Sequence, residues 1–170
     1  MKIKKITSKS ETKKTDKEDT YLINADEKTI RSIIASLKQK KIKKKIAVLG
    51  RDDDFNRRMI EKTEIDFLVS PERGKRKDTL KQRDSGLNHF LAKEAKKKNI
   101  GIAIDFDEIN QIKDRKEKSL RLGKIIQNIK ICRRAGCKIL IWGNTDVYAL
   151  RAFGFSLGMS SGQVSEAIKT

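Results

Sequence analysis

The sequence predicts an α/β fold whose strands are mainly parallel. Short apolar runs, each long enough for one buried strand, alternate with stretches in which apolar residues recur at helical spacing. The apolar runs are Thr20–Ile23, Ile46–Leu49, Ile65–Val69, Ile100–Phe106 and Cys137–Trp142. A strand–helix unit repeated about five times implies parallel strands with right-handed crossovers, in a barrel or in a doubly wound sheet. Five strands are few for a closed eight-stranded barrel, which usually takes roughly 200 residues or more.

The predicted helices are marked by apolar stripes and by the residues at their ends. Asp26 is a candidate N-cap for a helix with isoleucine or leucine at positions 30, 33, 34 and 37. The longest predicted helix is Arg115–Ala135, and Gly136 follows it as a stop. The remaining helices are expected over Phe55–Lys62, over Leu87–Lys98, from Thr145 or Asp146 to Leu157, and from Ser160 or Ser161 to Ile168.

The N-terminal stretch Met1–Asp19 is expected to form a disordered basic arm. Its only large apolar residues are Met1, Ile3 and Ile6, too few to offset the entropy lost on ordering. The arm is a candidate for contact with nucleic acid, and a solvated tail without a partner is the alternative. Residues 20–170 are then predicted to form a single α/β domain.

The chain is strongly basic. It carries 41 Lys and Arg against 23 Asp and Glu, a formal net charge of +18 in 170 residues. This excess is larger than solubility requires, so an extended polyanion is the expected partner. Aromatic residues make up only 5% of the chain, which argues against sequence-specific binding of single strands by base stacking. A protein that contacts phosphate backbone is favoured, and a lysine-rich surface without a polyanionic partner is the alternative.

The sequence also indicates the cellular compartment of the protein. No apolar segment approaches the length of a membrane span, and the N-terminus lacks the apolar core of a signal peptide. Cys132 and Cys137, in a chain without an export signal, are expected to be reduced thiols. We therefore predict a cytoplasmic protein that does not bind membranes.

The stretch from Ile65 to Ala92 combines a buried strand, a basic loop and a helix. The loop, Ser70–Asp84, is opened by Pro71, the only proline. Barrels and open α/β sheets bind ligands in the loops that follow the carboxyl ends of strands, so this loop is a candidate RNA-binding site. Its basic residues are Arg73, Lys75, Arg76, Lys77, Lys81 and Arg83. The lysine run from Lys38 to Lys45 exceeds what the helix dipole needs and is a second candidate for phosphate contact.

Two acidic clusters follow predicted strands. The first, Asp52–Asp54, has the ligands for Mg²⁺, but such a cluster more often caps a helix. The second is Asp105, Asp107 and Glu108, where barrel enzymes place catalytic acids and where capping is the alternative. Neither cluster identifies an acid–base pair, so no catalytic residue is predicted.

The only histidine is His89, and a metal site built on imidazole needs several histidines or cysteines. No metal site is therefore predicted. The chain also lacks a GxSxG elbow, a P-loop and a GxGxxG motif. We expect His89 either to hydrogen-bond the basic loop to the following helix or to contact RNA directly.

Several motifs occur in an order that resembles a known family. Ile65–Pro71 (IDFLVSP) matches a strand end, and Arg83–Ala92 (RDSGLNHFLA) matches a D-x-G-x-x-H element at the start of a helix. The strand Asn99–Phe106 (NIGIAIDF), the basic helix Arg115–Ala135 and the tail from Ala149 onward follow. On these residues the sequence resembles ribonuclease P protein component 3, the 30-kDa-subunit family of archaeal and eukaryotic ribonuclease P.

The resemblance implies a TIM-barrel-like (β/α) fold, shortened or incomplete here, and a non-catalytic subunit. In this family the RNA subunit removes the 5′ leader of precursor tRNA, with Mg²⁺ expected on the RNA and no cofactor on the protein. The implied partners are ribonuclease P RNA, ribonuclease P protein component 2 and other protein subunits, with precursor tRNA contacted indirectly. Arg83, His89, Lys93 and Lys98 match basic or polar positions of the family and are predicted RNA contacts. The family's P-R-D before the penultimate helix is replaced by Val147–Ala149, so no RNA contact is expected there.

Two other classes of function remain open from the sequence. A general, ribosomal-type RNA-binding protein would share the charge without requiring ribonuclease P RNA. A small metal-dependent barrel hydrolase would act through Asp105 and Asp107 and would need no RNA.

Overall fold

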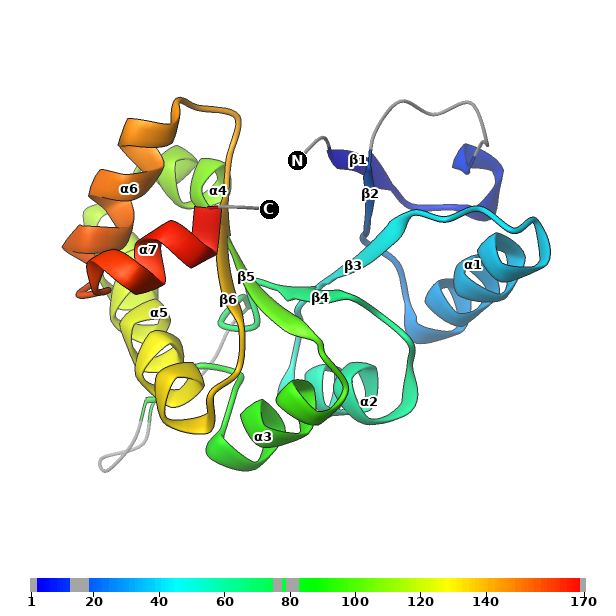
Figure 1. Ribbon diagram of the computed structural model, residues 1–170, viewed down its shortest axis with the longest axis horizontal. Helices are drawn as coiled ribbons and strands as arrows, with labels where there is room; N and C mark the ends of the chain where they lie inside the picture. Colours follow the sequence, from blue (N-terminus) through cyan, green and yellow to red (C-terminus); the bar gives the residue numbers. More distant parts are fainter. Residues whose placement is uncertain (1–2, 13–18, 75–77, 79–82, 169–170) are drawn as a thin grey trace.

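A six-stranded parallel sheet organises the structure, a computed structural model that describes residues 3–12, 19–74, 78 and 83–168. Each strand pairs with its neighbours in the chain, so the strand order across the sheet follows the sequence. The sheet curls into a half-barrel (Figure 1). The strands are β1 (Ile3–Ile6), β2 (Thr20–Ile23), β3 (Lys45–Leu49), β4 (Phe67–Val69), β5 (Gly101–Asp105) and β6 (Ile139–Trp142).

Helices connect the strands and cover the outside of the curve. Figure 1 shows α1, α2, α3 and α5 along the convex side of the sheet. The helices are α1 (Glu27–Gln39), α2 (Asp53–Lys62), α3 (His89–Lys97), α4 (Phe106–Gln111), α5 (Arg115–Ala135), α6 (Val147–Ser156) and α7 (Ser161–Ile168), with a short 3₁₀ turn, η1 (Lys9–Glu11). The predicted α/β fold, a TIM-barrel-like and incomplete repeat with parallel strands, is confirmed.

Apolar side chains cover both faces of the sheet. The larger cluster lies between the sheet and the helices and includes Ile23, Ile33, Met59, Leu68 and Ile129. The second cluster comes from the alternate strand positions, which face the other way. It consists of Leu22, Ala47, Leu49, Phe67, Val69, Ala103, Leu140 and Trp142. Burial on both faces makes β2 to β6 nearly continuous apolar runs, which is why the sequence pattern located these strands.

The prediction that Met1–Asp19 is disordered is wrong for β1. Ile6 pairs with Ile23 in the parallel ladder, and only 1% of its surface is exposed. The ladder and the burial of this isoleucine offset the ordering entropy on which the prediction relied. Residues 1, 2 and 13–18 lie outside the described residues. The division of the chain at residue 19 therefore stays a prediction.

Polar side chains cap the helices at the carboxyl ends of the strands. Asp52 accepts a hydrogen bond from the amide of Phe55 at 2.8 Å, and Asp105 accepts one from the amide of Glu108 at 3.1 Å. The capping role weighed for both acidic clusters is therefore confirmed for these two aspartates. Helix α4, which Asp105 caps, was not predicted. The other side-chain caps belong to Asp26, Asn88, Asp114 and Asp146.

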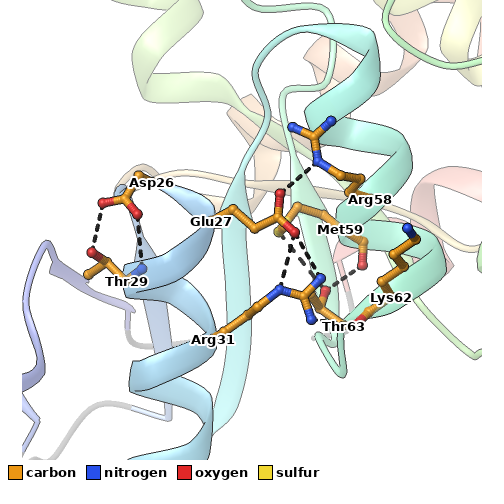
Figure 2. Close-up of polar contacts among 8 residues, drawn as sticks. All are labelled: Asp26, Glu27, Thr29, Arg31, Arg58, Met59, Lys62 and Thr63. Carbon is orange, nitrogen blue, oxygen red and sulfur yellow. Dashed lines mark hydrogen bonds and ion pairs between the residues drawn. The ribbon is translucent and has the colours of Figure 1, made fainter.

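Ion pairs fasten α1 to α2 on the outer surface (Figure 2). Glu27 accepts hydrogen bonds from Arg31, one turn later at 2.8 Å, and from Arg58 of α2 at 2.6 Å. Arg31 also donates to the carbonyl oxygen of Lys62 at 3.1 Å. The hydrogen bonds from Arg31 and then from Arg58 hold the pKa of Glu27 below its usual value.

Two further features bear on the sequence predictions. Among the described residues, none of the helices combines the length and the apolar character that crossing a bilayer requires. Cys132 on α5 and Cys137 just before β6 are both buried, and neither forms a disulfide.

Candidate functional site

The loops after β3, β4 and β5 surround a charged depression of about 820 Å³ at the carboxyl end of the sheet. This is the end where barrels bind their ligands. Side chains of both signs line it, so it is no simple anion site. The charged lining residues are Arg51, Asp52, Glu72, Arg73, Glu108, Glu117, Arg121 and Lys124.

One buried amide holds the backbone at this end together. Asn56 of α2 donates to the carbonyl oxygens of Arg51, Pro71 and Gly86 at 3.2, 3.0 and 3.2 Å. Its own oxygen accepts from the amide of Arg51 at 2.8 Å. A Cβ at Gly50 would lie 2.7 Å from the Cα of Pro71, so only glycine allows the loops to approach this closely. Asn56 thus ties the ends of β3 and β4 to the segment that enters α3.

A network of ion pairs spans the depression. Arg121 of α5 lies 3.2 Å from Glu72 and 3.1 Å from Glu108, measured between side-chain nitrogen and oxygen. Arg73 pairs with the same oxygen of Glu108 at 2.6 Å. The side chain of Glu72 is 1% exposed, and this burial raises its pKa although Arg121 opposes the shift. The predicted contact Arg73 is therefore engaged within the protein.

Glu72 and Arg121 were missed by the sequence analysis. They are 49 residues apart in the chain, and no spacing rule connects them. Glu72 is an isolated acid among the first cations of the basic loop, and that isolation is the one signal that marks it in the sequence.

The segment Arg83–Asn88 is fixed against α5. Asn128 donates to the carbonyl oxygen of Ser85 at 3.0 Å, and Gln127 donates to that of Arg83 at 3.0 Å. Asn88 caps α3 by accepting from the amide of Leu91 at 2.9 Å. Much of the motif that carried the family resemblance therefore shapes the backbone at the start of α3.

Of the predicted RNA contacts at this end, Arg83 and His89 are exposed. The guanidinium of Arg83 lies against α5, where a Cβ at Gly123 would clash with it. His89 is the first residue of α3, and its imidazole has no hydrogen-bond partner among the described residues. The start of the basic loop is linked instead through Asn56, which donates to Pro71 and to Gly86 just before α3.

The other predicted contacts are not gathered at one place. Lys93 is exposed on α3, and Lys98 is the C-cap of that helix. A helix of nine residues is about 13 Å long, so Lys98 lies toward the opposite end of the strands from His89. Its ammonium group donates to the carbonyl oxygen of Glu61. Lys75, Arg76, Lys77 and Lys81 lie outside the described residues, and the role of all these positions stays a prediction.

The two candidate catalytic acids of a hydrolase accept hydrogen bonds from backbone amides. Asp105 caps α4, and Asp107 accepts from the amide of Asn144 at 2.7 Å. Burial raises the pKa of Asp105, although the hydrogen bond from the amide of Glu108 opposes the shift. Among the described residues, no three His, Cys, Asp or Glu side chains are grouped so that they could hold a metal ion.

Comparison with curated proteins finds relatives named ribonuclease P protein component 3. No family model matches the chain. Ribonuclease P protein component 3 of Methanococcus maripaludis strain C6 is 30% identical over 120 residues, which cover 68% of this chain and 48% of that protein. The protein of the same name from Methanococcoides burtonii is 38% identical over 64 residues, 38% of this chain and 23% of that protein.

Solved structures agree on the fold. A chain in a cryo-EM structure of archaeal ribonuclease P with mature tRNA matches with a TM-score of 0.68 at 24% identity, over 87% of this chain and 63% of that chain. The chain spans about half the length of the curated relatives it matches in sequence, 48% for the protein from strain C6. The resemblance noted in the motifs is confirmed: the chain is a homologue of the ribonuclease P protein component 3 family.

Proposed function

We propose that the chain is a protein subunit of ribonuclease P that assists a catalytic RNA in removing the 5′ leader of precursor tRNA. The observation that carries this proposal is the 30% identity over 120 residues to a protein named as component 3 of that enzyme. The net charge of +18 supports a polyanionic partner. The acids Asp105 and Asp107 serve as hydrogen-bond acceptors for backbone amides, which favours a non-catalytic subunit over a hydrolase.

The proposed partners are ribonuclease P RNA, ribonuclease P protein component 2 and the other protein subunits. Precursor tRNA is contacted through the assembly. We place the Mg²⁺ ions of the reaction on the RNA and no cofactor on this chain. The cytoplasm is the proposed compartment, in keeping with the unbridged thiols of Cys132 and Cys137.

Reconstitution tests this function. Transcribed ribonuclease P RNA and component 2 of Methanococcus maripaludis are mixed with precursor tRNA, with and without this chain, and the cleavage rate is measured over a series of Mg²⁺ concentrations. We expect the chain to raise the rate at limiting Mg²⁺, because its cations neutralise RNA phosphates. Cleavage by the chain alone, or a cleavage rate that does not change when the chain is added, would contradict the proposal.

The basic loop can be tested separately. Replacing Arg76, Lys77, Lys81 and Arg83 together by alanine is expected to weaken binding of the same RNA. The slope of log affinity against log salt concentration is negative. If each side chain neutralises one phosphate, the variant's slope is smaller in magnitude by about 3. Filter binding at NaCl concentrations from about 50 to about 400 mM measures that slope. An unchanged affinity and slope would remove this loop from the RNA interface.

A further inference from the structure

Acidic and basic residues are unequally distributed between the two ends of the sheet, although the carboxyl end also carries basic residues such as Arg51, Arg73 and Lys124. Acids gather at the carboxyl end, where the helices begin: Asp26, Glu27, Asp52, Asp53, Asp54, Glu72, Asp78, Asp84, Asp105, Asp107, Glu108, Asp114, Glu117 and Asp146. Cations gather at the amino end, where helices finish and strands start: Lys38, Lys40, Lys41, Lys43, Lys44, Lys45, Lys62, Lys96, Lys97, Lys98, Arg133, Arg134 and Lys138. The acids in the loops and helix ends of that end include Asp19, Glu61, Glu64, Asp66 and Glu94.

Helix dipoles account for only part of this division. They favour acids at helix N-termini and bases in the last helical turn. The bases in last turns are Lys38, Lys62, Lys96, Lys97, Arg133 and Arg134. Lys40 and Lys98 are the C-caps of α1 and α3, and the ammonium group of Lys98 donates to the carbonyl oxygen of Glu61 near the end of α2, so helix termini also favour these two. The lysines beyond the helix ends, where the dipole gives no reason for them, are Lys41, Lys43, Lys44, Lys45 and Lys138.

Some of these lysines lie around a hollow at the amino end. Its volume is about 790 Å³, and its charged lining residues are Lys38, Lys41, Lys43, Lys44, Glu64, Asp66 and Lys98, over a floor that includes Leu37, Ile42, Ile46, Ile65 and Ile100. The lysines come from the α1–β3 loop and from the end of α3, so the fold brings together cations that are more than fifty residues apart in sequence. One of them, Lys38, is paired with Glu64. Lys40, Lys41, Lys43, Lys98 and Lys138 are all exposed.

The spacing of these lysines suits a nucleic-acid backbone. Lys138 leads into β6, three strands from β3, a distance of about 14 Å along the sheet at the usual strand separation. A nucleic-acid duplex carries one phosphate for roughly each 3.4 Å of its axis on each strand, so several phosphates fall within that distance. No exposed large apolar side chain of the described chain belongs to these loops, whereas a protein interface needs such anchors.

We propose that the amino end of the sheet binds the phosphate backbone of RNA. We call this surface the lysine rim and define it as Lys40, Lys41, Lys43, Lys98 and Lys138. It lies at the opposite end of the strands from the basic loop, and its lysines bind phosphates as point charges, without reading bases. This inference rests on the proposed function and specifies where the RNA is held.

Two matched variants test the lysine rim. The first replaces Lys40, Lys43 and Lys138 by glutamine. The second replaces Lys28, Lys113 and Lys116, which are exposed lysines at the other end of the sheet, also by glutamine. Each variant of the full chain loses three positive charges, so a difference between them reports the position of the charges. Binding of Methanococcus maripaludis ribonuclease P RNA is measured at a series of NaCl concentrations, and thermal unfolding verifies that both variants fold.

We expect the rim variant to lose about tenfold in affinity at moderate salt, with a salt slope lower by roughly 2 to 3. The matched variant is expected to stay within about twofold of wild type. Equal losses in both variants, or no loss in the rim variant while wild type binds, would overturn the rim and leave the proposed function standing. Failure of wild type to bind the RNA would overturn both. Displacement of the RNA by an equal charge of polyglutamate would assign the rim to acidic proteins and also overturn the inference.

Discussion

At the scale of single residues, the carboxyl end of the sheet is held by buried polar side chains. Asn56 bonds three carbonyl oxygens from separate segments, and Arg121 bridges Glu72 and Glu108. Buried polar groups are stable only when they are satisfied, so each of these contacts constrains its neighbours. The charged side chains that line the depression are therefore largely paired with one another.

The raised pKa of Glu72 leads to a prediction about pH. Because burial favours the protonated acid, the folded state binds this proton up to a higher pH than the unfolded state does. The stability that Glu72 contributes is complete below its unfolded pKa, ordinarily about 4.3, and is lost as pH rises through the folded value. Glu72→Gln removes this dependence.

We therefore expect the unfolding free energy of wild type to fall relative to Glu72→Gln as pH rises from about 4 toward 8. Urea unfolding of both proteins at each pH measures the difference, and effects of other acids, such as Asp105, cancel in the comparison. A wild type that gains on the variant with rising pH would show that the ion pair with Arg121 outweighs desolvation.

At the scale of elements, β1 shows that a strand with few apolar residues can form when it pairs with another strand of the sheet. Its sequence is IKKI, and Ile6 alone is fully buried. The strand pairs with β2, whose residues are all buried, and packs into the cluster under α1. The first element of the chain is thus part of the domain core.

Replacing Ile6 by alanine tests that conclusion. The change leaves a cavity in the main core, and we expect a loss of about 2–4 kcal/mol in unfolding free energy, as for other buried isoleucines. Lys5→Ala is the matched control, because Lys5 is exposed on the same strand. Urea unfolding is the measurement. An Ile6→Ala variant as stable as the control would mean that this segment is a loosely attached arm and is not part of the core.

At the scale of the whole molecule, charge is the dominant feature. A net charge of +18 repels itself, and most of the excess described here lies at one end of the sheet. Compact folding concentrates those lysines, so the folded state carries an electrostatic cost that salt reduces.

We expect the unfolding free energy to rise between about 20 and 200 mM NaCl, by an amount on the order of 1 kcal/mol, the scale of exposed charge interactions. The rim variant, which lacks three of the clustered lysines, should show a smaller rise than the variant of Lys28, Lys113 and Lys116. Denaturant unfolding at each salt concentration measures both. A fall in stability with added salt would mean that attractive pairs such as Glu27 with Arg58 dominate.

Features that depend on local sequence were predictable, and features that depend on distant residues were not. Strands β2 to β6 and the cap Asp26 were predictable because local sequence determines them. Strand β1 was missed because its evidence is the partner strand, and α4 because it buries only Ile109. The Glu72–Arg121 pair and the lysine rim join residues far apart in the chain, so only the topology brings them together.

The order of the sheet also bears on how the molecule is made. Each strand pairs with the one just before it, and no two paired residues are further apart in the chain than Ile102 and Ile139. During translation, the partner of every new strand has already left the ribosome when that strand emerges. The nascent polypeptide can extend its architecture one unit at a time, without waiting for a distant segment to be synthesised.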